Sequence, residues 1–99
     1  MIDLSKYADR TVDFMIEGEM VRVQELSHAL YRKVVAYEAE PASAESFDKR
    51  TELILEMLNR NTSGKKFKIA DLDKMPEGAL NRIYQEVVYL SRKALTDPN

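Results

Sequence analysis

The sequence predicts an α+β domain that is mainly α-helical, with an N-terminal β-hairpin at about residues 11–24. Three main helices and one short extra helical turn are expected to follow it, within residues 27–95. Two observations predict this class: apolar residues alternate on both sides of Gly18, and beyond the hairpin they recur at three- and four-residue spacing. The length of 99 residues fits a single domain spanning 1–99.

Residues 1–10 show no periodicity and are expected to be irregular. The hairpin that follows is expected to turn at Glu17-Gly18, because a two-residue loop there brings apolar residues opposite each other on one face. The same register pairs Asp13 with Arg22 on the other face, and a shift by one residue would lose that agreement. Because Glu is not ideal at the first position of a type I′ turn, a three-residue bulged turn stays open as an alternative. The pairs of the apolar face are Val12–Val23, Phe14–Val21 and Ile16–Glu19, and Met15–Met20 joins the other face.

The expected helices have residues that favour their starts or stops. Ser27 and Ser43 are candidate N-caps of the first two helices, since a serine hydroxyl accepts a backbone N–H of the first turn. Pro41 ends the first helix, and Pro76 suits the first turn of the third. Residues 96–99 are polar and are expected to form a frayed tail. The expected helices span about 27–39, 43–59 and 77–95, with the short helical turn inside 69–75.

Several apolar residues remain after the helix stripes that should face the core have been assigned. The main stripe of the second helix consists of Phe47, Thr51, Ile54 and Leu58. Leu53 and Met57 lie beside that stripe, and they close the core only if this helix is covered on more than one side. Methionine adapts to different partners, so the leftover residues predict a protein-binding surface. The residues expected to contact a partner are Met15, Met20, Leu53, Met57, Tyr84, Val88, Tyr89 and Leu95.

The composition argues against most catalytic and metal-dependent chemistry. The chain has no cysteine, which excludes disulfides, thiol nucleophiles and cysteine-based zinc sites. Its single histidine, His28, falls in the first turn of the first helix and lacks the partner histidines of a zinc site. Neither a Gly-rich phosphate loop nor a Gly-x-Ser-x-Gly motif occurs. We therefore expect a protein that is not an enzyme and binds no cofactor or metal. No purely apolar run is longer than four residues, too short for a bilayer, and no secretory signal is visible, so a soluble intracellular domain is expected.

Charge is distributed unevenly along the chain, although the formal net charge is only −2. Residues 1–59 carry twelve acids against seven Lys or Arg, and residues 60–99 carry five against eight. This asymmetry indicates either self-association, in a homo-oligomer, or a patch for a charged partner. The alternative for the most basic stretch is a solvated loop. That stretch contains Arg60, Lys65, Lys66 and Lys68.

Residues 67–90 have the outline of a helix-turn-helix motif, with a short helix, a break at Pro76 and a longer helix. Only Asn81 and Arg82 near the start of the longer helix could contact bases, and Glu77 close to them would repel phosphate. A small DNA-binding regulator therefore stays an alternative, but nucleic acid is not the expected partner.

Four segments together give the chain a family resemblance. They are TVDFMIEGEMVRV at Thr11–Val23, LILEMLNRN at Leu53–Asn61, GKKF at Gly64–Phe67 and IADLDKMP at Ile69–Pro76. With a hairpin, helices and a basic connector in this order, the chain resembles the small tail assembly chaperones of long-tailed bacteriophages, especially those of phages that infect Gram-positive hosts. The resemblance covers most of the chain.

This resemblance implies a non-enzymatic protein in the cytoplasm of the bacterial host. Such chaperones bind the tape measure protein, a long and aggregation-prone helical chain, keep it soluble and help tail tube protein subunits polymerise around it. They leave before the virion matures, and the family commonly makes a longer product by translational frameshifting. Residues 96–99 would be the place where such an extension follows. A phage head–tail structural adaptor, which would persist in the particle, is the other function left open.

Overall fold

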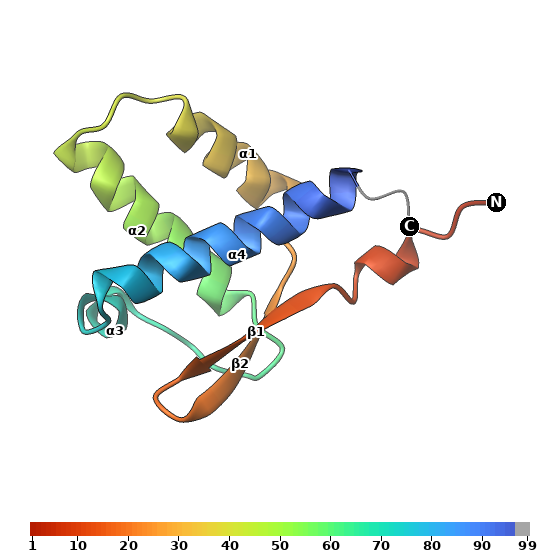
Figure 1. Ribbon diagram of the computed structural model, residues 1–99, viewed down its shortest axis with the longest axis horizontal. Coiled ribbons are helices and arrows are strands. Elements are labelled where there is room, and N and C mark those ends of the chain that lie inside the picture. The colour runs from red at the N-terminus through yellow and green to blue at the C-terminus, as the bar shows by residue number, and fades with distance from the viewer. Residues whose placement is uncertain (97–99) are drawn as a thin grey trace.

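The computed structural model describes residues 1–96 of the chain, and side chains up to residue 93. It confirms a mainly α-helical α+β fold in which an antiparallel hairpin precedes the helices (Figure 1). The elements are the 3-10 turn η1 (Ser5–Tyr7), β1 (Thr11–Ile16), β2 (Glu19–Gln24), α1 (His28–Glu38), α2 (Ala44–Asn59), α3 (Ile69–Asp73) and α4 (Glu77–Thr96). Residue 96, the first of the expected frayed tail, is the last residue of α4. The other residues of that expected tail, 97–99, lie outside the described residues. None of the described helices is long and apolar enough to cross a membrane.

The hairpin has the register expected from the sequence. Phe14 faces Val21 and Asp13 faces Arg22, and the two strands are joined by a two-residue turn. Glu17 and Gly18 have φ values of 50° and 79°, the positive values that a type I′ turn requires. The bulged alternative is therefore wrong, and Glu17 occupies a left-handed conformation that glycine or asparagine would adopt more easily. On the outer face Arg22 donates two hydrogen bonds of 2.9 and 3.1 Å to the Asp13 carboxylate, and these lower the pKa of Asp13.

The outer edge of β2 is closed by the segment that follows α2. The Gln24 N–H donates to the Arg60 carbonyl at 2.8 Å, and the Thr62 N–H donates to the Arg22 carbonyl at 2.9 Å. The Arg22 N–H donates to the Ser63 hydroxyl at 3.1 Å. Residues 60–63 thus bond to Arg22 and Gln24 on the side of β2 that β1 does not reach.

The helix starts were predicted correctly from local signals. The Ser27 hydroxyl accepts the N–H of Leu30 at 3.1 Å and caps α1. Ser43 and Ser46 form a reciprocal capping box at the start of α2, with bonds of 3.1 and 2.7 Å. Pro41 lies in the connection between the two helices, as expected. These contacts fix where the two helices begin without help from distant residues.

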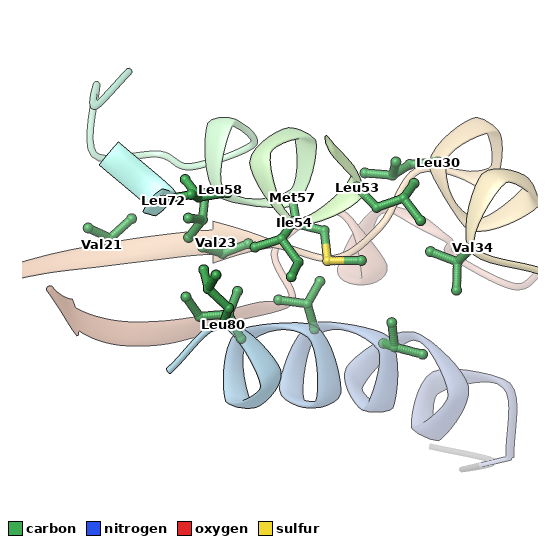
Figure 2. Close-up of a cluster of buried hydrophobic side chains, with 13 residues drawn as sticks. Val21, Val23, Leu30, Val34, Leu53, Ile54, Met57, Leu58, Leu72 and Leu80 are labelled. Carbon is green, nitrogen blue, oxygen red and sulfur yellow. The ribbon is translucent and has the colours of Figure 1, made fainter. Parts of the chain in front are cut away.

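The core lies between α2 and α4, with the valines of β2 at one end (Figure 2). Helix α2 is central, because it contacts α1, α3, α4 and β2. Leu53, Met57 and Val88 belong to this core, with exposed fractions of 6%, 0% and 3%. The expectation that these three lie beyond the core is wrong. Elements on several sides of α2 bury Leu53 and Met57, and Val88 of α4 joins the same cluster. The most completely buried side chains are Val21, Val23, Val34, Ile54, Met57, Leu58, Leu72 and Val87.

Helix α2 is also turned relative to the expected stripe. Phe47, expected in the core, is 52% exposed, while Arg50 is only 8% exposed. The Arg50 guanidinium lies 5.5 Å from the centre of the Phe47 ring, donates to the side chain of Asn81 and forms an ion pair with Glu77 at 3.1 Å. A charged residue therefore takes the buried position, because its partners come from the first turns of α4.

Candidate interaction surface

Met15 and Met20 form an exposed apolar patch on the outer face of the hairpin. They lie opposite each other across the two strands, and 72% and 48% of their surfaces are accessible. The inner face of the hairpin already packs on the core through Val21 and Val23. The patch is therefore surplus to the core, and its flexible side chains suit contact with a partner.

A groove of about 360 Å³ runs beside β1 and the start of α4. Its apolar lining comes from two parts of the chain that are far apart in sequence. Glu17, Lys74 and Arg82 are its charged members. The volume falls at the lower end of the range of about 300–1,000 Å³ that is typical of ligand pockets. The apolar lining residues are Phe14, Met15, Ile16, Met75, Pro76, Ala79 and Ile83.

Tyr84, one of the predicted partner residues, is half-buried and joins α4 to α1. Its hydroxyl donates to the Glu38 carboxylate at 2.8 Å, and burial followed by this hydrogen bond raises the pKa of Tyr84. Arg92 donates to Glu38 and, at 3.2 Å, to the Tyr31 hydroxyl. The rings of Tyr37 and Tyr84 meet edge to face at 6.1 Å between centroids. These contacts assign Tyr84 a structural role.

The other predicted residues of α4 are placed differently. Tyr89 is 61% exposed, and it follows Arg82 by seven residues, which puts the two on the same face of the helix. Val88 points into the core, and the side chain of Leu95 lies outside the described residues. The structure therefore brings Met15 and Met20 together on the hairpin, and it places Tyr84, Val88 and Tyr89 around one shallow hollow on α4, away from the hairpin patch.

The basic stretch is partly used inside the fold. The Arg60 guanidinium donates to the Glu25 carbonyl at 2.9 Å, and Lys65 forms an ion pair with Glu19 near the hairpin turn. Lys66 and Lys68 are exposed. Half of the stretch thus fastens the hairpin to the loop after α2, and the solvated-loop interpretation holds for the other half.

Of the two residues that a helix-turn-helix protein would use to contact bases, Asn81 is engaged within the chain, while Arg82 stays largely exposed. Asn81 accepts the hydrogen bond from Arg50, and Arg82 forms an ion pair with Glu86 at 2.9 Å. The short helix α3 has only five residues. No described feature favours DNA as the partner of this pair of helices.

Among the described residues, no group of three or more His, Cys, Asp or Glu side chains could hold a metal ion. His28 is exposed in the first turn of α1, directly after the Ser27 cap.

Sequence reasoning missed the groove, Phe47 and the buried Arg50. The groove combines β1 with the α3–α4 junction, so no local pattern signals it. Comparison of the chain with protein-family models, curated proteins and solved structures finds no significant match.

Proposed function

We propose that the protein is a non-enzymatic tail assembly chaperone of a long-tailed bacteriophage. In this role it binds the tape measure protein in the cytoplasm of the bacterial host, keeps it soluble and assists assembly of the tail tube protein around it. It leaves before the particle matures.

The observation that carries this proposal is the exposed Met15–Met20 patch together with the groove next to it. A chaperone of this kind needs apolar surface that adapts to its client and charge that keeps the complex soluble. The hairpin offers such a surface on its outer face, while its inner face is fixed on the core. The resemblance described above supplies the identity of the client.

Co-expression with the tape measure protein of the same phage genome tests the proposal. We expect the wild-type chain to keep this client in the soluble fraction. The double variant Met15→Glu/Met20→Glu should release it into the pellet, because two carboxylates cannot enter an apolar contact without partners. Val35→Glu, at an α1 residue that is 48% exposed, is the matched control and should behave as wild type.

The possible outcomes test the chaperone function and the role of the methionine patch independently of each other. A wild-type chain that fails to keep the client soluble contradicts the chaperone function. A folded double variant that works as well as wild type contradicts the role of the methionine patch. Mass spectrometry of mature particles adds a second test, because the chain should be absent there. Its presence would instead identify a structural adaptor.

A further inference from the structure

The outer edge of β1 is open, in contrast to the covered edge of β2. In an antiparallel pair, opposite residues alternate between pairs that bond to each other and pairs whose backbone groups point away from each other. Arg22 and Gln24 direct their backbone groups away from β1, since these groups bond to residues 60–63. Their partners across the hairpin, Asp13 and Thr11, must therefore point away from β2.

Met15 belongs to the same series, two residues beyond Asp13 on β1. The backbone N–H and C=O groups of Thr11, Asp13 and Met15 thus form a row along the free edge. No described residue bonds to any of these groups. Such a row is a template for another strand, and proteins usually shield it with charge, proline or a covering segment.

The groove lies along the half of this open edge that is nearer the hairpin turn. There Phe14 to Glu17 form one wall, and the start of α4 forms the other. A strand added to β1 would place alternate side chains on the inner face, next to Phe14 and Ile16. There they would meet Met75, Pro76 and Ile83 on the opposite wall. The edge supplies backbone hydrogen bonds and the groove supplies an apolar pocket, the two parts of strand addition.

The charges at the groove indicate what kind of segment fits. Lys74 forms no ion pair with any described residue, and Arg82 is paired only with its neighbour Glu86, with 72% of the Arg82 side chain accessible. Glu17 is the only acidic residue of the lining. An acidic residue in the added strand would therefore find in Lys74 a cation that no described carboxylate pairs with.

We propose that the β1 edge and the groove bind a segment of the client polypeptide as an added strand, while that segment is extended and has not yet formed helix. The segment has apolar residues at alternate positions and an acidic residue beside Lys74. This inference rests on the proposed chaperone function, and it states how the client is held. Because backbone hydrogen bonds supply much of the affinity, one edge can accept many different segments of a long client.

A second copy of β1 is a poorer occupant of this edge. The apolar side chains of β1, Val12, Phe14 and Ile16, already pack against its own core, so they are not available to enter another groove. A register centred on Asp13 would also place two Asp13 carboxylates opposite each other, which is unfavourable.

Proline substitution tests the edge with a matched pair of variants. Met15→Pro removes an N–H from the open edge of β1, and its ring also blocks the approach of another strand. Met20→Pro removes the equivalent N–H directly opposite, on β2, and it sacrifices the same side chain of the patch. Both variants keep the ladder between the two strands, because the residues that bond across it are unchanged.

The probe is a fluorescent peptide of about eight residues, a common strand length, with Val or Leu alternating with Thr and a single Asp. Fluorescence anisotropy should show that Met15→Pro weakens binding by about tenfold or more, the effect of losing roughly 1.4 kcal/mol. Met20→Pro should lose only the contribution of one patch side chain, so its affinity should stay well above that of Met15→Pro. Lys74→Glu should weaken binding of the Asp peptide and leave an Asn version of the peptide unaffected.

Several results would overturn the inference. Equal affinities of Met15→Pro and Met20→Pro for the peptide would do so and would leave the chaperone function intact. A wild-type dimer that dissociates in Met15→Pro would assign the edge to a second copy instead. If Met15→Pro does not fold, a peptide N-methylated at alternate residues replaces it. Undiminished binding of that peptide by wild type would exclude strand addition.

Discussion

Met15 and Met57 carry the same side chain in opposite environments. Met15 is 72% exposed on the hairpin, whereas Met57 is fully buried between α2 and α4. We expect Met57→Ala to lower the free energy of unfolding by about 2–5 kcal/mol, because it leaves a cavity in the core. Met15→Ala should change it by less than about 0.5 kcal/mol, as a surface substitution does. Urea denaturation of both variants measures the difference, and equal losses would contradict the assignment of Met57 to the core.

Phe47 and Arg50 show where prediction from single residues fails, because the apolar side chain is exposed and the charged one is buried. A helix stripe read from apolar residues places Phe47 inside, because burial normally follows hydrophobicity. The actual choice depends on Glu77 and Asn81, which stand near the start of α4 and offer the Arg50 guanidinium an ion pair and a hydrogen-bond acceptor. No sequence pattern near residue 50 indicates these partners, which follow it by 27 and 31 residues.

At the scale of elements, local interactions explain why the boundaries were predictable. The caps at Ser27 and Ser43 and the turn at Glu17-Gly18 each involve residues within a few positions of one another. Packing between elements is not local. The groove, for example, joins β1 to Met75 and Ile83, so its existence follows only from the folded arrangement. The sequence therefore predicted one part of the candidate site, the exposed methionines, because side chains alternate between the two faces of a strand. It did not predict the groove.

The contact between α1 and α4 should depend on pH through Tyr84. The folded chain raises the pKa of Tyr84 above its ordinary value of 10.0, so folding favours the protonated phenol. The resulting stabilisation is fully present below pH 10 and is lost as pH rises from there toward the raised pKa.

Denaturation curves of wild type and Tyr84→Phe between neutral and alkaline pH test this. At neutral pH the variant should be less stable by about 0.5–1.5 kcal/mol, since it lacks the hydrogen bond to Glu38. The deficit should shrink above pH 10, because only the wild type loses this contribution. Tyr89→Phe, at an exposed residue, is the control. A deficit that stays constant with pH would show that Tyr84 titrates alike in both states.

On the scale of the whole molecule, the acidic and basic halves of the sequence are partly neutralised by each other. Two ion pairs join acids of residues 1–59 to bases of residues 60–99, Glu19–Lys65 and Glu38–Arg92. A third, Arg50–Glu77, joins the two parts in the opposite sense. Asp48 on α2 and Lys66 and Lys74 near the groove remain without an ion pair among the described residues. The charge left over for contact between copies is therefore smaller than the sequence alone indicates.

We predict that any self-association is weak and sensitive to salt. Light scattering should give a larger average mass at low ionic strength than at about 1 M salt, where the screening length falls to about 3 Å. Lys66→Glu combined with Lys74→Glu should give the monomer mass at both. A wild-type monomer under both conditions would contradict pairing between the two charged regions.

The closure of β2 by residues 60–63 has a consequence for the chain as it is made. Synthesis proceeds from the N-terminus, so both strands of the hairpin leave the ribosome before α2 and the segment that follows it. A two-stranded hairpin is marginally stable on its own in water. The hairpin therefore matures only when Ser63 has emerged, and until then a nascent chain exposes two open strand edges. Once residues 60–63 bond to Arg22 and Gln24, that stretch of the β2 edge is covered, while the β1 edge stays open among the described residues.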